Sequence, residues 1–76
     1  MKAYVVITAR TGTALDIVKA MTTLPEVKMA DACWGTHDVY AVVEVQDWKD
    51  LNSLVMDKVQ RLPGVERTET HVAVSS

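Results

Sequence analysis

Two segments of the sequence are apolar at both alternating sets of positions, and this feature restricts the possible folds more than any other. In segment 39–46, valine and alanine fill one set of positions, while Tyr40 and Val42 begin the other set. The N-terminal segment 2–9 shows the same pattern with alanine, valine, isoleucine and tyrosine. Short runs of β-branched and aromatic residues are typical of β-strands. Because each predicted strand has two apolar faces, both faces of its sheet need a cover.

Two segments with helical periodicity separate the predicted strands. Segment 14–24 has apolar residues at spacings of three and four, which is typical of a helix with one buried face. Thr13 and Asp16 resemble a capping box at its start, and Pro25 is expected to end it. Asp47 is placed to cap a second helix. The apolar positions that keep the helical period in this second helix are Leu51, Leu54, Val55, Val59 and Leu62.

The remaining segments complete the order of elements. Further strands are predicted over 27–34 and 65–74, and the dipeptide Pro63-Gly64 ends the second helix before the last strand. Residues 35–38 form a tight hairpin loop. The order strand-helix-strand-strand-helix-strand is that of the split βαβ, or ferredoxin-like, arrangement. We therefore predict an α+β fold: a four-stranded antiparallel sheet with both helices on one face.

The chain is too short for two domains, so we predict one domain over residues 1–76. Domains of this size usually add a disulfide, a structural metal or a partner subunit to a small core. Cys33 is the only cysteine, which excludes an intrachain disulfide. Two histidines and one thiol also lack the ligand spacing of a structural zinc site. Self-association is the stabilising feature that remains.

Charge and hydropathy argue against several classes of partner. The net charge is −2, and the lysines and arginines are scattered, so the chain carries no basic patch for nucleic-acid phosphates. No apolar run approaches the roughly 20 residues of a membrane span, and no targeting peptide is visible. We expect a soluble, cytoplasmic protein that contacts neither nucleic acid nor a membrane directly.

The predicted architecture leaves one face of the sheet open, and apolar side chains are expected on it. Tyr4, Val6 and Val42 belong to the set of positions that faces away from the helices. Such a patch usually marks an interface, and each fully buried side chain of this kind contributes on the order of 1.5 to 3 kcal/mol. We therefore predict a homodimer formed through the sheet. The alternative is that strand propensity alone explains the valine-rich runs.

Three short motifs, taken together, resemble a known family. The hairpin has the form Gly-x-x-Asp at Gly35 and Asp38, the turn after the second helix reads Leu-Pro-Gly-Val over 62–65, and Thr68 and Thr70 lie on the last strand. In this order and spacing, the motifs resemble the effector-binding domain of the Lrp/AsnC family of transcriptional regulators, often called the RAM domain. The resemblance covers essentially the whole chain.

The resemblance implies a single RAM, or ACT-like, domain. Such domains form βαββαβ dimers that associate into octamers or decamers, with a small amino-acid effector bound near the seams between subunits. Full-length members carry an N-terminal helix-turn-helix, whereas this chain begins directly at its first predicted strand. We therefore expect a stand-alone version, which would act through a full-length Lrp/AsnC regulator and would not bind DNA itself.

An amino-acid effector needs an acceptor for its ammonium group, donors for its carboxylate and a pocket for its side chain. Asp38 would accept the ammonium, Gly35 would let backbone N–H groups approach the carboxylate, and Thr68 and Thr70 would add hydroxyl donors. Alternatively, Asp38 fixes the hairpin by an Asx-type contact, Gly35 supplies a positive φ, and the threonines are ordinary strand surface. The predicted ligand-binding residues are Gly35, Thr36, His37, Asp38, Thr68 and Thr70.

His37 invites a metal or catalytic interpretation that its surroundings in the sequence do not support. His37, Asp38 and His71 come from different elements and form no metal-ligand spacing motif. No serine lies in a recognisable pattern with a histidine, and Cys33 near His37 is an isolated coincidence. We therefore predict no catalytic residue, no metal and no cofactor. His37 is interpreted as a loop residue that faces solvent or lines the pocket, where it would make binding sensitive to pH.

The leading hypothesis is a non-enzymatic sensor that binds an amino acid or a related metabolite and modulates transcriptional regulation. The alternative is a small dimeric α+β barrel enzyme, of the cofactor-free monooxygenase or isomerase type, which has a similar order of elements. Such an enzyme needs a polar cavity between helices and sheet, and the helix-facing positions here are aliphatic. A structural oligomerisation module with a vestigial pocket is a third possibility.

Overall fold

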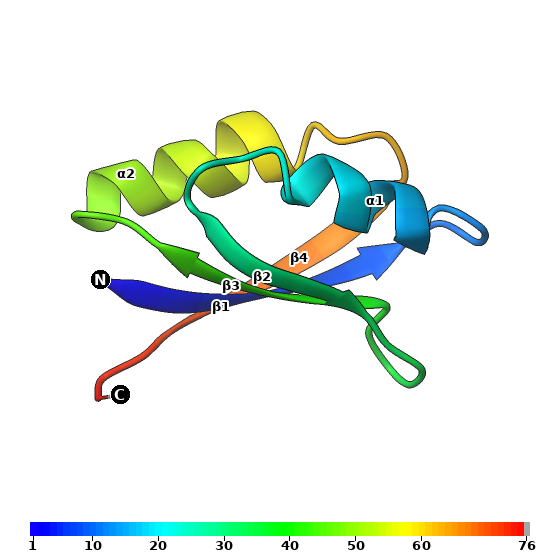
Figure 1. Ribbon diagram of the computed structural model, residues 1–76, viewed down its shortest axis with the longest axis horizontal. Helices are drawn as coiled ribbons and strands as arrows, with labels where there is room; N and C mark the ends of the chain where they lie inside the picture. Colours follow the sequence, from blue (N-terminus) through cyan, green and yellow to red (C-terminus); the bar gives the residue numbers. More distant parts are fainter. Residues whose placement is uncertain (76) are drawn as a thin grey trace.

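The computed structural model describes residues 1–75, and it has a four-stranded sheet with its helices on one face (Figure 1). The predicted order of elements is confirmed, with a π-helical segment, η1, directly continuing the second helix. The elements are β1 (Lys2–Ala9), α1 (Ala14–Met21), β2 (Val27–Ala32), β3 (Val39–Glu44), α2 (Trp48–Ser53), η1 (Leu54–Val59) and β4 (Val65–Val72).

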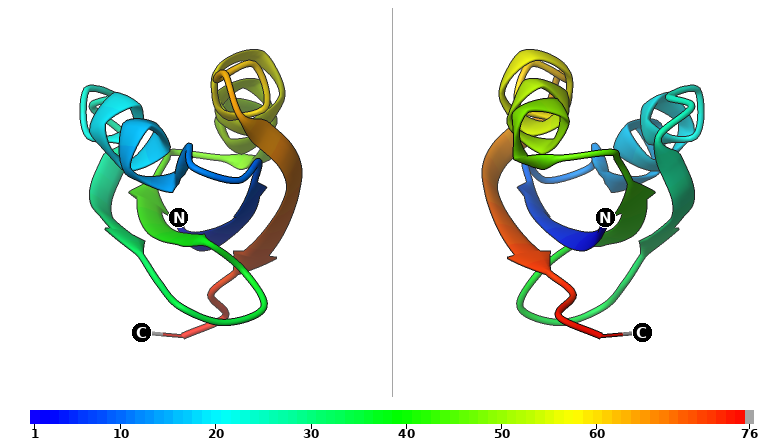
Figure 2. Two further views of the ribbon diagram at one scale, coloured as in Figure 1. Left: turned by 90° about the vertical axis from the view of Figure 1, so that its right-hand side faces the viewer. Right: turned by 90° about the vertical axis from the view of Figure 1, so that its left-hand side faces the viewer.

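The sheet has the strand order β2-β3-β1-β4, and each neighbouring pair is antiparallel. β1 is central, with Val5 opposite Ala41 of β3 on one side and opposite Thr70 of β4 on the other. Figure 2 shows α1 and the continuous helix α2–η1 side by side, as one layer on one face of the sheet. The loop between β2 and β3 curves away on the other face. The predicted ferredoxin-like architecture is therefore confirmed.

The core lies between the helices and one set of alternating positions on the two central strands. In β1 and β3, six residues of this set are at most 2% exposed, and Ala9 at the end of β1 is partly buried; the six are Ala3, Val5, Ile7, Val39, Ala41 and Val43. The helices contribute the side chains that pack against them: Ile17, Met21, Leu51, Leu54, Val55 and Val59. Among the described residues, no polar or charged residue is buried in this layer. The helical periodicity in the sequence thus identified the core face of both helices.

Three of the strands end earlier than predicted. β2 ends at Ala32 instead of residue 34, since the Cys33 N–H donates to the carbonyl of Asp38 at 2.8 Å and closes the loop there. The loop therefore spans residues 33–38 instead of 35–38. β3 ends at Glu44 instead of residue 46, just before the cap of α2. β4 ends at Val72 instead of residue 74.

The predicted capping box at the start of α1 is wrong, whereas the predicted cap of α2 is confirmed. The Thr13 hydroxyl donates back to the carbonyl of Arg10 at 2.7 Å and accepts no helical N–H. At α2, the Asp47 carboxylate accepts the backbone N–H of Asp50 at 2.9 Å. α1 also ends at Met21, earlier than residue 24, because the following residues form tight turns before Pro25.

The open face of the sheet carries an apolar centre. Tyr4 is 44% exposed, Tyr40 is 42% exposed and Met29 is 53% exposed. Val6 is only 8% exposed within a single chain, because it lies between the larger side chains of Tyr40 and Glu69 on the neighbouring strands. Within one chain, neighbouring side chains therefore cover Val6, while the larger apolar side chains around it stay exposed. We call Tyr4, Val6, Met29, Tyr40 and Val42 the open-face patch.

Gly64 allows the chain to pass from η1 into β4, and its replacement tests this packing. Gly64 has a φ of +93°, and a Cβ added there would come within 2.6 Å of the Thr13 Cβ. We expect Gly64→Ala to lower the free energy of unfolding by at least about 2 kcal/mol, from backbone strain and overpacking together. Urea denaturation measures the loss.

Gly12→Ala is the matched control for this substitution. Gly12 has a similar φ of +85°, but a Cβ there meets nothing within 4 Å. It should lose only the strain of the left-handed conformation, about 1 to 2 kcal/mol. Equal losses in the two variants would show that the contact with Thr13 has no energetic weight.

Candidate functional site

Asp38 fixes the loop 33–38 against the end of β1. Its carboxylate oxygen Oδ2 accepts the backbone N–H of Ala9 at 2.8 Å, and its own N–H donates to the carbonyl of Ile7 at 3.0 Å. The pairing of β1 with β3 ends at Ile7 opposite Val39, so the N–H of Ala9 lies beyond that ladder and needs an acceptor from elsewhere. The structural interpretation of Asp38 therefore holds in a modified form: the side chain joins the loop to β1 and makes no turn within the hairpin.

The other loop residues take different positions. Gly35 has a φ of +133°, in the region that glycine adopts most readily, and is exposed. Thr36 is exposed as well. His37 is half-buried under the open face, with Nδ1 at 3.4 Å from the Thr8 hydroxyl and Nε2 at 3.6 Å from the Glu69 carboxylate. Its ring also meets the edge of Tyr40, with 6.1 Å between the centroids.

Thr68 and Thr70 lie away from the loop. Both share the helix-facing side of β4, because they pair with Ile7 and Val5 of β1. The Thr68 hydroxyl accepts a hydrogen bond from the Gln60 side-chain amide at 3.0 Å, and Thr70 is exposed. The structure thus brings the four predicted loop residues together and leaves the two threonines on the edge strand.

Two cavities border these residues. One, of about 460 Å³, lies between the loop and the start of α1 and includes the fully exposed Trp34; its lining residues are Ala14, Leu15, Ala32, Cys33, Trp34, Gly35 and Asp38. The other, of about 310 Å³, lies beside β4 and is lined by Gln60, Val65, Glu66, Arg67 and Thr68. Within one chain, therefore, the predicted ligand-binding residues contribute to two separate cavities, and Thr36, His37 and Thr70 line neither.

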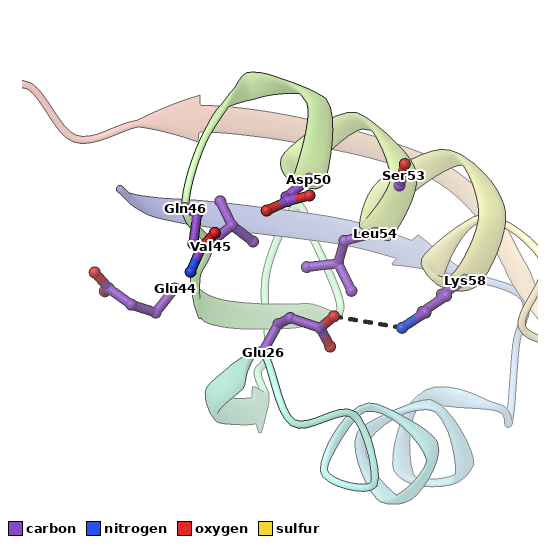
Figure 3. A pocket seen from close by; sticks show the side chains of 8 residues that line it. All are labelled: Glu26, Glu44, Val45, Gln46, Asp50, Ser53, Leu54 and Lys58. Carbon is purple, nitrogen blue, oxygen red and sulfur yellow. Dashed lines mark hydrogen bonds and ion pairs between the residues drawn. The ribbon is translucent and has the colours of Figure 1, made fainter.

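A third cavity, of about 430 Å³, was not predicted from the sequence (Figure 3). It lies between α2–η1 and the ends of β2 and β3, and its lining residues are Glu26, Glu44, Val45, Gln46, Asp50, Ser53, Leu54 and Lys58. The Lys58 ammonium contacts the Glu26 carboxylate at 3.3 Å across it. Asp50, Leu54 and Lys58 follow each other at spacings of four, which indicates one helix face. No sequence pattern predicts that Glu26 lies opposite this helix face, because Glu26 lies in the turn before β2, far from the helix in the sequence.

Glu26 is the one group of the described chain with a clearly shifted pKa. A hydrogen bond from its own backbone N–H lowers the pKa of this carboxyl most, and the ammonium of Lys58 lowers it further; partial burial opposes both. Glu26 therefore stays ionised at neutral pH.

Several other kinds of site are absent from residues 1–75. No group of three or more histidine, cysteine or carboxylate side chains is arranged to hold a metal ion. Cys33 is a free, exposed thiol. The space between helices and sheet is filled with aliphatic side chains. None of the helices in this part of the chain is long and apolar enough to cross a membrane.

A filled core under two helical layers, an open sheet face and a tethered loop at the β2–β3 hairpin define a small ferredoxin-like domain of the binding type. The family model described as the Lrp/AsnC ligand binding domain matches residues 2–76. The chain therefore belongs to the Lrp/AsnC ligand-binding domain family, as its three motifs indicated.

The curated relatives are longer proteins. One is an uncharacterized HTH-type transcriptional regulator of Pyrococcus abyssi, which is 29% identical over 73 residues. The match covers 96% of this chain and 46% of the relative. A Pyrococcus horikoshii regulator of the same description is 26% identical with the same coverage. The chain thus spans about half the length of the curated relatives it matches.

Solved structures share this fold, some over nearly their whole chain and others over about half of it. The Thermus thermophilus protein TTHA0845 is 32% identical with a TM-score of 0.92, and the match covers 99% of this chain and 94% of that one. The structure of Escherichia coli AsnC has a TM-score of 0.92 at 17% identity, covering 99% and 51%. A complex of the Neisseria meningitidis transcriptional regulator NMB0573 with L-Met has a TM-score of 0.88 at 18% identity, covering 97% and 49%. At 17% and 18% identity, the similarity to the last two structures shows a shared fold and nothing more.

The tether between Asp38 and Ala9 can be tested by substitution. We expect Asp38→Ala to lower the free energy of unfolding by about 1 to 3 kcal/mol, because it leaves the half-buried N–H of Ala9 without an acceptor. Hydrogen exchange at the Ala9 amide should accelerate in the same variant. Urea denaturation and NMR-detected exchange measure the two effects.

Two controls accompany this prediction. Asp38→Asn keeps an oxygen that can accept the same hydrogen bond, so its loss should be smaller. Thr36→Ala removes an exposed side chain from the same loop and should change stability by less than about 0.5 kcal/mol. An Asp38→Ala variant as stable as Thr36→Ala would contradict the role of the tether.

Proposed function

We propose that this chain is a non-enzymatic sensor domain that binds an amino acid or a related small metabolite in an oligomer. The observation that carries the proposal is the loop 33–38, which Asp38 holds rigidly as one wall of a cavity, in a chain of the Lrp/AsnC ligand-binding family. The complex of a structurally similar regulator with L-Met supports an amino acid as the ligand class. Gly35, Thr36, His37 and Asp38 are the proposed loop contacts.

The tether leaves Asp38 able to act on a ligand. Ala9 uses the oxygen Oδ2, and within residues 1–75 the structure gives no hydrogen bond to the oxygen Oδ1. An ammonium group placed at Oδ1 would gain a charge-assisted hydrogen bond from a carboxylate that is already fixed in position. The structural and the ligand-binding roles of Asp38 are therefore compatible.

A site that uses both the loop and the threonines requires a second copy of the chain. Thr68 and Thr70 face the helix side of β4, whereas the loop curves onto the open face, where His37 lies 3.6 Å from Glu69, so one chain does not bring the threonines to the loop. We infer that dimers form through the open-face patch and associate further into octamers or decamers. The effector would then lie at a seam, between the loop of one subunit and the β4 threonines of another.

The alternative, an α+β barrel enzyme, lacks support in the core. Such an enzyme would need polar groups in a cavity between the helices and the sheet, where this chain has only buried aliphatic side chains among its described residues. We further propose that the domain acts in the cytoplasm by joining or competing with a full-length Lrp/AsnC regulator and does not contact DNA directly. The length of the curated relatives, about twice that of the matched region, supports such a partner.

Sedimentation velocity tests the proposed oligomer. At micromolar concentration we expect a mass of at least twice the 8.4 kDa of one chain. Tyr4→Glu should weaken the association at least 100-fold, because it replaces an aromatic side chain of the open-face patch with a carboxylate that association would bury, and the nearby Lys2 ammonium offsets only part of that cost. Trp48→Glu is the control, since Trp48 is also an exposed aromatic, at 62%, but lies on α2. A wild-type chain that sediments as a single copy would refute the oligomer.

A thermal-shift screen with the standard amino acids tests the ligand. We expect at least one amino acid at millimolar concentration to raise the Tm, since a ligand that binds only the folded state stabilises it by mass action. Thr70→Val should reduce this shift. Thr11→Val, an exposed threonine in the turn before α1, should leave it unchanged. No shift with any amino acid would count against the sensor.

A further inference from the structure

We propose that the cavity between α2–η1 and the ends of β2 and β3 is a second binding site, specific for the ammonium group of a small aliphatic amine. This site is distinct from the proposed effector site, since none of its lining residues belongs to the loop 33–38 or to β4. Its volume of about 430 Å³ lies within the usual range for small-molecule sites, about 300 to 1,000 Å³.

The polar wall of the cavity has unused acceptors. The Glu26 oxygen Oε2 contacts the Lys58 ammonium, but the oxygen Oε1 is buried and accepts no hydrogen bond from any other residue of the described chain. A buried acceptor without a partner is costly and rare in folded proteins. The carboxylate of Asp50 is exposed and makes no hydrogen bond or ion pair in residues 1–75, while its backbone N–H is used by the cap of α2. An ammonium group, with three donors, fits between such acceptors.

The charge of the cavity favours a cation. Glu44 already lies 3.6 Å from the α-amino nitrogen of Met1, and Lys58 already pairs with Glu26. Asp50 is the carboxylate left over. Because Glu26 stays ionised at neutral pH, the cavity keeps a negative charge in excess. A ligand with a carboxylate is disfavoured, because Lys58 is the only ammonium group that lines the cavity and it already pairs with Glu26.

The remaining wall is apolar and suits an alkyl stem. Val45 and Leu54 form the buried floor of the cavity. Gln46 and Lys58, which also line it and are exposed, provide aliphatic surface at its sides through their methylene groups. Figure 3 shows these side chains beside the carboxylates of the polar wall. A primary amine on a short hydrocarbon chain therefore matches the polar and the apolar walls together.

The helical wall has an unusual backbone. Leu54 begins the π-helical segment η1, which also carries Lys58. π-Helical turns are rare and frequently occur at functional sites, because they widen the helix locally and redirect its side chains. Here the π-helical segment adjoins the cavity and directs Leu54 and Lys58 toward Glu26. The π-helical backbone is thus a second feature, independent of the carboxylates, that marks this cavity as a functional site.

NMR titration of the ¹⁵N-labelled protein with pentylamine tests the proposal, with 1-pentanol as the neutral probe of equal chain length. We expect saturable shifts at residues 26, 44–46 and 50–58 with pentylamine, and at least tenfold weaker binding of 1-pentanol. The double variant Glu26→Gln, Asp50→Asn should also bind pentylamine at least tenfold more weakly. Asp57→Asn removes a carboxylate of η1 outside the cavity and should bind like the wild type.

Ser53→Phe gives a second test that removes no charge. Ser53 is exposed at the cavity, so the larger side chain should fill the space without disturbing the core and should abolish the shifts. Absence of shifts in the wild type, equal binding of 1-pentanol, or shifts confined to residues 33–38 would each overturn the proposal. Thr70→Val tests the proposed effector site, so its loss of amino-acid binding would not change the binding of pentylamine at the cavity beside α2–η1.

Discussion

The complete burial of one set of alternating positions on β1 and β3 determines the rest of the structure. These side chains are small or β-branched, so the helices approach the sheet closely and leave no space for polar groups between the layers. Because side chains alternate along a strand, burying Val5 and Ile7 forces Tyr4 and Val6 onto the opposite face. A register shift of one residue would exchange the two faces. The open-face patch is thus a consequence of the core.

The functional features lie at the two ends of the sheet, away from the filled centre. At one end, Asp38 ties the hairpin loop to Ala9, and the Arg10 N–H donates to the carbonyl of Gly64 at 2.7 Å. These bonds join the β2–β3 loop and the η1–β4 turn to the end of β1. At the other end, the ion pair of Lys58 with Glu26 spans the cavity between η1 and the turn before β2. Loops carry the polar chemistry because the core excludes it.

The sequence predicted the order of elements and both core faces, because periodicity depends only on residues close together along the chain. It failed where two local partners compete for one group and where a residue's partner is distant along the chain. The capping box at Thr13 is wrong because the hydroxyl finds the nearer carbonyl of Arg10. The acceptor role of Asp38 toward Ala9 and the pairing of Glu26 with Lys58 both join residues far apart in the chain. The loop was therefore predicted as a site, whereas the cavity lined by Glu26 was missed.

The separation of the predicted ligand-binding residues is itself an argument about assembly. The loop 33–38 curves onto the open face, where His37 reaches Glu69 of β4, but Thr68 and Thr70 face the helix side of that strand. The sheet itself separates the loop residues from the threonines of the same chain, so one amino acid does not contact both within a single chain. Either the threonines are strand surface, or a neighbouring copy supplies them. Only the second case makes binding depend on assembly, which is the property that lets a ligand control an oligomer.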